Sequence, residues 1–123
     1  MRAVWILLVL LAGSGAWWLA SGRGPEIGRG LPSAHRAADQ EFDRRVRERF
    51  PVGTPMAEVE RELVRQGFSS TPFREEATSA EGGPGLHFDM QAAGFPCRDR
   101  WQVVAHGTEA VEGVRGTFGG ICL

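Results

Sequence analysis

The sequence predicts an α+β protein, in which an N-terminal transmembrane or signal helix precedes two helices packed on a three-stranded antiparallel meander. Three observations support this fold class. An uncharged apolar run opens the chain, two stretches then show hydrophobic residues at helical spacing, and after Gly85 apolar and polar residues alternate. A chain of 123 residues has room for one small domain. We divide it into a signal-anchor or signal peptide over 1–22, a flexible linker over 23–33 and an α+β domain over 34–123.

The N-terminal segment has the length and composition of a membrane span. Residues 3–20 carry no charged side chain, and about 18 residues rising about 1.5 Å each give roughly 27 Å, close to a hydrocarbon core of about 30 Å. Trp17 and Trp18 suit the headgroup region. We therefore expect an uncleaved single span. The alternative is a cleaved signal peptide, because Arg2 and the apolar run are followed by small residues at 14–16 and 20–22.

The same region bears on the location of the domain. The stretch LLAGS at residues 10–14 is similar to the lipidation site of bacterial lipoproteins, but Ser14 has no thiol and so excludes a lipid there. More arginines follow the apolar segment than precede it, and the positive-inside rule would then place the domain in the cytoplasm. The signal-like start and the two cysteines favour the other side. We expect a single-pass protein of the bacterial inner membrane with a periplasmic domain, or a periplasmic or secreted domain after cleavage.

A linker and a first helix follow. Residues 23–33 include three glycines and two prolines, and this composition predicts a flexible tether. Ser33 is then a suitable N-cap for a helix over 34–50. Its apolar residues recur every four positions on one face. They are Ala38, Phe42, Val46 and Phe50. Acids and arginines at i,i+4 spacing, including Glu41 with Arg45, predict a solvated outer face.

The second helix has clear signals at both ends. Thr54 is the expected N-cap and Pro55 the first helical residue, where its missing N–H costs nothing. Met56, Val59 and Leu63 form the apolar stripe. Gly67 is placed to adopt the left-handed conformation that ends a helix, so that Phe68 folds back onto Leu63.

The remainder of the chain predicts strands. Residues 69–85 are polar and rich in turn formers, which indicates a weak edge strand or a loop. Leu86, Phe88 and Met90 then alternate with polar residues in a first clear strand. A second strand over 100–106 and a third over 114–123 complete the meander, with the two helices on one of its faces.

The two cysteines lie near the ends of neighbouring predicted strands. Cys97 precedes the second strand and Cys122 lies one residue from the end of the third. A disulfide between them would close a loop of about 26 residues, worth roughly 3.5 kcal/mol in the chain-entropy model. An export-like N-terminus favours this bridge. The alternative is a pair of reduced thiols in a cytosolic domain. Their spacing matches no zinc-ligand pattern, so we expect no metal site.

Candidate chemistry is sparse. His87 and Asp89 share the outward face of one predicted strand and His106 ends the next, so the three could hold a metal or act as a base. No serine or cysteine is placed beside them as a nucleophile, so we expect no catalytic residue and no cofactor. We interpret the three as partner contacts. Trp101 is expected to pack between sheet and helices, or to anchor a partner if it is exposed.

Charge excludes one class of partner. From Gly24 onward the chain has 12 Arg against 15 acidic residues. It therefore lacks the basic excess that neutralises a phosphate backbone, and we expect no nucleic-acid binding.

The second helix carries a family resemblance. The segment FPVGTPMAEVERELVRQGF is similar to the helix of small bacterial envelope proteins of the SmpA/OmlA type. The matching positions are Gly53, Thr54, Val59, Leu63 and Gly67. β-Lactamase-inhibitor-like modules share the plan of helices and sheet. This chain departs from the pattern, because it lacks the lipidated cysteine and has a proline before the hydrophobic stripe. The resemblance implies a non-catalytic module that binds another envelope protein, and no individual binding residue carries over from it.

Three functions follow as hypotheses. The leading one is a membrane-tethered periplasmic binding or assembly accessory, held through residues 3–20 and contacting an envelope protein. The second is a soluble exported inhibitor or ligand-binding domain, released by signal cleavage. The third is an enzyme that uses His87, Asp89 and His106. The sequence indicates no oligomeric state.

Overall fold

The computed structural model describes residues 24–73 and 83–122. The predictions made for the N-terminal apolar segment therefore lie outside the described residues. Within the described ranges, no helix has both the length and the apolar character that a membrane crossing requires.

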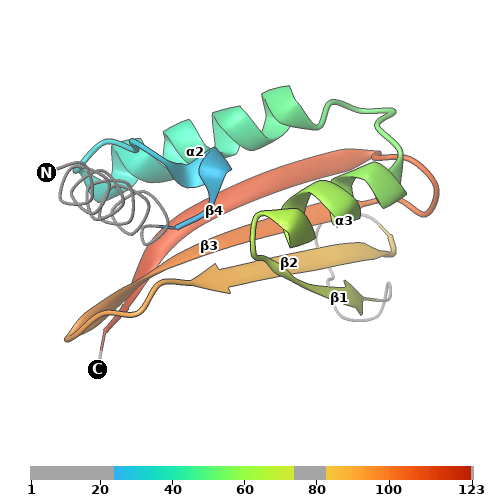
Figure 1. Cartoon of the computed structure of the whole chain (residues 1–123). Coiled ribbons are helices and arrows are strands. Elements are labelled where there is room, and N and C mark those ends of the chain that lie inside the picture. The colour runs from blue at the N-terminus through green and yellow to red at the C-terminus, as the bar shows by residue number, and fades with distance from the viewer. Residues whose placement is uncertain (1–23, 74–82, 123) are drawn as a thin grey trace, which may run out of the picture.

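The protein has an α+β fold of two layers, with the helices on one face of an antiparallel sheet (Figure 1). The elements in chain order are a 3-10 helix η1 (Glu26–Gly28), the helices α2 (His35–Arg49) and α3 (Met56–Arg65), and the strands β1 (Ser69–Phe73), β2 (Gly85–Gln91), β3 (Cys97–His106) and β4 (Gly113–Cys122). The sheet order β1-β2-β3-β4 is a simple meander. The predicted α+β class and the meander are confirmed.

The prediction of three strands was wrong, because β1 adds a fourth at the edge of the sheet. Ser69 to Phe73 pair in register with Asp89 to Gly85 of β2. Pro72 is tolerated there because an edge strand needs only half of its backbone N–H groups for pairing. For residues 69–85 the sequence allowed either a weak edge strand or a loop. The structure shows that this region begins with an edge strand, β1.

Helix α2 packs along β4 through both apolar and polar contacts. Its predicted stripe is buried, and Phe50 is buried just beyond its end. Asp39 and Asp43 accept hydrogen bonds of 2.9 Å from the backbone N–H groups of Phe118 and Gly116. Four helical residues rise about 6 Å and two strand residues about 6.7 Å, so the two carboxylates match alternate edge N–H groups of β4. They cover an edge that would otherwise be unpaired.

The start of α2 differs from the prediction. The helix begins at His35 with Ala34 as its N-cap residue, and no side chain caps it. Ser33 is therefore not the cap. Helix α2 draws its stability from the packing of its inner face rather than from a local start signal.

Helix α3 confirms the predicted stripe and C-terminus. Met56, Val59 and Leu63 are buried. Gly67 has a φ of +107°, the Gly67 N–H donates to the Val64 carbonyl and the Phe68 N–H to the Leu63 carbonyl, each at 3.0 Å. These two bonds form a Schellman motif.

The N-terminus of α3 corrects the predicted cap. Pro55 occupies the N-cap position rather than the first helical position, and no side chain caps the helix. The Thr54 hydroxyl donates instead to the Pro51 carbonyl at 2.7 Å. Thr54 therefore stabilises the turn between the helices rather than the helix itself.

Residues 24–31, which we call the strap, pack on the domain and do not form the predicted flexible linker. Pro25 and Gly28 are buried. The Ile27 N–H donates to Gln66 Oε1 at 2.9 Å, and the Arg45 guanidinium donates to the carbonyls of Ile27 and Arg29. Composition alone indicated a tether, but these contacts come from α2 and α3 and hold the strap in place.

Within residues 24–73 and 83–122, a hydrophobic core lies between the helices and the sheet. Its residues are Phe42, Val46, Phe50, Met56, Val59, Leu63, Phe68, Phe88, Trp101, Val103, Ala105, Val111 and Val114. The predicted disulfide is confirmed, since Cys97 and Cys122 are bonded and lie opposite each other in the register of β3 and β4. It joins the two strands at the end of the sheet that lies beyond the core.

Candidate functional site

The face of the sheet opposite the helices, which we call the open face, carries mainly polar side chains, together with Val104 and Phe73. Strand alternation directs Phe88 and Val103 into the core and their neighbours to the other side. Its polar side chains include His87, Asp89, Arg100, Gln102, Arg115 and Thr117. No described helix covers this face (Figure 1).

Side chains in the middle of the open face pair with one another across β2 and β3. Asp89 Oδ1 lies 2.7 Å from Arg100 Nε in a half-buried ion pair. The ring nitrogen Nε2 of His87 lies 3.2 Å from Gln102 Nε2. These partners restrict one another's rotamers, so the centre of the open face is a preorganised polar surface.

His106 lies apart from this pairing. Its Nδ1 is 3.3 Å from the Gly83 carbonyl oxygen, and its ring stands edge-on to Phe73 with 5.3 Å between centroids. The predicted His87–Asp89–His106 cluster does not form, because the register places Val104 opposite His87 and Gly85 opposite His106. Among the residues that the structure describes, no group of His, Cys, Asp and Glu is arranged to hold a metal ion.

Trp101 is a core residue and not an exposed partner contact. Only 4% of it is exposed. Its indole lies against the strap, so close that a Cβ added at Gly28 would stand 2.5 Å from Nε1, and its ring centroid is 5.6 Å from that of Phe118. Nε1 is buried and has no hydrogen-bond partner among the described residues. The packing alternative of the sequence prediction is therefore confirmed, and the contact alternative was wrong.

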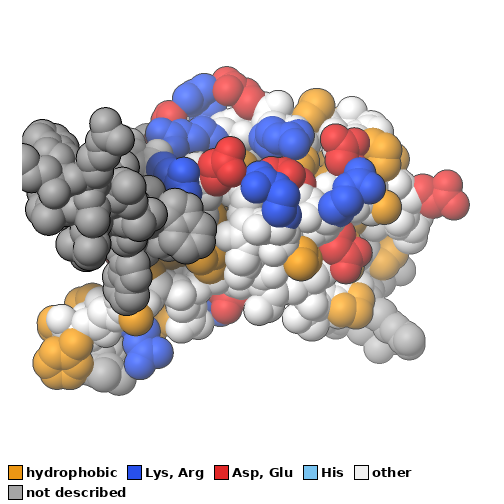
Figure 2. All heavy atoms as spheres, in the orientation of Figure 1, with side chains coloured by type: hydrophobic (Ala, Val, Ile, Leu, Met, Phe, Trp, Pro, Cys, Tyr) orange, Lys and Arg blue, Asp and Glu red, His pale blue; other side chains and the backbone are white. Residues whose placement is uncertain are grey.

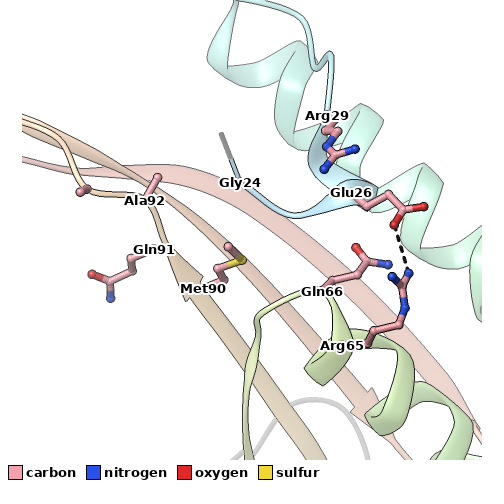
Figure 3. Close-up of a pocket in the computed structure, with 9 residues that line it drawn as sticks. Gly24, Glu26, Arg29, Arg65, Gln66, Met90, Gln91 and Ala92 are labelled. Atoms are coloured by element: carbon pink, nitrogen blue, oxygen red, sulfur yellow. Dashed lines mark hydrogen bonds and ion pairs between the residues drawn. The ribbon is translucent and has the colours of Figure 1, made fainter. Parts of the chain in front are cut away.

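A hollow of about 460 Å³ lies between the strap, the end of α3 and the end of β2 (Figure 3). Its lining includes Gly24, Glu26, Arg65, Gln66, Met90 and Ala92. Sequence reasoning missed it, because the strap was expected to be flexible and one wall of the hollow is the strap itself.

Two of the charged groups that line the hollow, Glu26 and Arg65, are engaged with each other, whereas Arg29 forms no ion pair with a described residue. Arg65 Nη2 lies 3.1 Å from Glu26 Oε2 and 2.6 Å from Glu62 Oε1. Hydrogen bonds from Arg65 and Gln66 lower the pKa of Glu62 to about 2. The described lining contains no histidine, cysteine or serine. The Glu26–Arg65 pair therefore joins the strap to α3, and the described lining of the hollow offers no activated nucleophile.

No protein-family model, curated protein or solved structure matches this chain.

Proposed function

We propose that this protein is a non-catalytic, membrane-tethered envelope protein that binds another envelope protein through its open face. The apolar segment 3–20 supports the tether, and the Cys97–Cys122 disulfide supports an oxidising compartment such as the periplasm. The similarity of the second helix to SmpA/OmlA-type proteins supports a binding role.

The observation that carries the proposal is the paired polar surface on the open face. Non-obligate interfaces are about as polar as the rest of a protein surface. A surface whose side chains already hold one another loses little conformational entropy when a partner binds. The pairs Asp89–Arg100 and His87–Gln102 provide such a surface.

The charge of this face indicates the kind of partner. Asp89 offsets Arg100, whereas Arg115 is exposed and forms no ion pair with any residue that the structure describes. The face therefore carries a net positive charge, and an acidic patch on the partner would complement it.

Photo-crosslinking in cells tests this function. A photoreactive amino acid replaces Thr117, which is exposed on the open face beside Arg115 and whose loss leaves the charge of that face unchanged. A matched variant carries it at Arg61 on α3, which is also exposed and outside the described ion pairs. We expect position 117 to give one discrete heavier adduct in the membrane fraction and position 61 to give none. Equal labelling at both positions, or no adduct from position 117, would contradict the proposal.

A further inference from the structure

The strap leaves little free chain between the apolar segment and the folded domain. Its first described residue, Gly24, lies against the Trp101 ring, with a φ of +83°. Only residues 21–23 separate Gly24 from Ala20, the last residue of the apolar segment. Four fully extended residues span at most about 14 Å. A chain anchored through residues 3–20 therefore holds the strap end of the domain next to the bilayer.

The connection between β2 and β3 lies at this same end of the domain. We call residues 92–96 the β2–β3 turn. Gly24 and Ala92 line the same hollow, on its strap wall and its sheet wall respectively (Figure 3). In Figure 1 the turn projects from the sheet at the end opposite the connection between α2 and α3. An anchor at residues 3–20, which joins the domain at Gly24, therefore places the turn on the membrane side of the domain.

The β2–β3 turn presents apolar side chains to solvent. Phe95 is 85% exposed and Ile121 of the adjoining strand is 37% exposed. Figure 2 shows hydrophobic side chains gathered at this end of the sheet. The Cys97–Cys122 disulfide begins one residue after the turn and fixes its base to β4. An aromatic side chain on a pinned turn enters an interface with little ordering cost.

Two arginines and one exposed carboxylate, that of Asp99, flank the turn, and the balance is basic. Arg98 lines a second hollow with Ala92 and Gly94, and Arg29 lines the first. Neither arginine forms an ion pair within the described part of the chain. Aromatic side chains next to arginines are the combination that binds the interface of an anionic bilayer.

We propose that the β2–β3 turn docks into the lipid interface beside the membrane anchor, with Phe95 in the headgroup region and Arg29 and Arg98 on anionic headgroups. This inference rests on the proposed membrane tether. It goes beyond that tether because it gives the domain a fixed orientation on the bilayer, with the long axis of the sheet rising from the surface. The open face then stays free for a protein partner.

Lipid quenching on the full-length protein tests the docking. An environment-sensitive fluorophore is attached to Ala93→Cys after the native disulfide has formed, and the protein is reconstituted into vesicles of phosphatidylcholine and phosphatidylglycerol that carry headgroup spin labels. The matched control carries the fluorophore at Val52→Cys, since Val52 is 75% exposed and lies between α2 and α3. A third variant combines Ala93→Cys with Phe95→Ser.

The proposal predicts that the fluorophore at position 93 loses most of its emission, that the one at position 52 keeps it, and that Phe95→Ser restores emission at position 93. Flotation with the vesicles and equal emission at both positions would overturn the docking and leave the tether intact. The emission of the fluorophore at position 93 could instead shift to shorter wavelength as more protein is added per vesicle, with no effect of the spin-labelled lipid. That result would indicate contact with a second copy of the protein and would also overturn the docking. Failure to float with the vesicles would overturn tether and docking together.

Discussion

Gly116 lies where β4 passes beneath α2, and its lack of a side chain allows that close approach. A Cβ at this position would stand 2.8 Å from Val46 Cγ2 and 3.2 Å from the Asp43 Cα atom. The second of these atoms is helix backbone and cannot rotate away. Gly119 lies on the same strand, and a Cβ there would meet nothing within 4 Å. The two glycines therefore form a matched pair.

We expect Gly116→Ala to lower the free energy of unfolding by about 1–3 kcal/mol, because α2 must move away from β4. Gly119→Ala should change it by less than about 0.5 kcal/mol. Urea denaturation of both variants measures the difference. Equal stability of the two would show that α2 does not press on β4 as described.

Glu62 links stability to pH. Hydrogen bonds from Arg65 and Gln66 lower its pKa from 4.5 to about 2, and hydrogen bonds from Arg44 and Arg45 lower the pKa of Glu41 to a similar value. A folded-state pKa below the unfolded value contributes stability that is present above the unfolded pKa and is lost as the pH falls through the folded one.

We therefore expect the urea midpoint to fall between about pH 4.5 and pH 2. Glu62→Gln should reduce this acid-dependent loss, because it removes one of the linked carboxylates. The control Glu60→Gln leaves the contacts of Arg65 intact and should keep the full loss. Urea titrations at several pH values supply the midpoints. An unchanged pH profile in Glu62→Gln would contradict the assignment.

Among the elements, the strap is held in place by helix α2, which follows it in the sequence. Arg45 pairs with Glu41 and also donates to the carbonyls of Ile27 and Arg29. Its neighbour Arg44 pairs with Glu41 and Glu48 and contacts no strap residue through a hydrogen bond. Both arginines therefore form ion pairs within the helix, but only Arg45 donates hydrogen bonds to the strap.

Replacement of Arg45 by alanine should loosen the strap. A hydrogen bond from a charged donor contributes about 1.5 kcal/mol or more, so amide exchange at Ile27 and Gly28 should accelerate by about tenfold or more. Arg44→Ala should leave exchange at these amides unchanged. Hydrogen exchange with mass spectrometry reads both. Similar exchange in the two variants would mean that Arg45 does not hold the strap.

Helix α3 was predicted from the sequence because its signals are local. Its stripe of Met56, Val59 and Leu63 repeats at helical spacing, and Gly67 ends it by a conformation that needs no distant partner. The strap could not be predicted in this way. The packing of the strap depends on Gln66, which lies 39 residues from Ile27, and on the indole of Trp101 in β3.

The open face was predicted in part. Period-two alternation correctly placed His87 and Asp89 on the outward side of β2. Their partners Gln102 and Arg100 could not be identified, because alternation fixes the face of a side chain and not the register between strands. The same missing register made a cluster with His106 plausible from the sequence.

The Cys97–Cys122 disulfide joins the C-terminal strand β4 to β3 and so limits the conformations of the unfolded chain as a whole. Cys97 and Cys122 are 25 residues apart, and the chain-entropy model gives such a bridge a worth of about 3–4 kcal/mol. Reduction should lower the free energy of unfolding by that amount. A double variant with alanine at both positions should show the lower stability and no response to reductant. Urea curves with and without reductant would contradict this if they coincide for the native chain.

We propose a domain that is anchored to a membrane and folded in an oxidising compartment. The most direct test is the intact mass of the native protein from isolated membranes, alkylated before and after reduction. We expect a full-length mass and alkylation of Cys97 and Cys122 only after reduction. A mass that lacks the N-terminal segment, or alkylation of both cysteines without reductant, would contradict it.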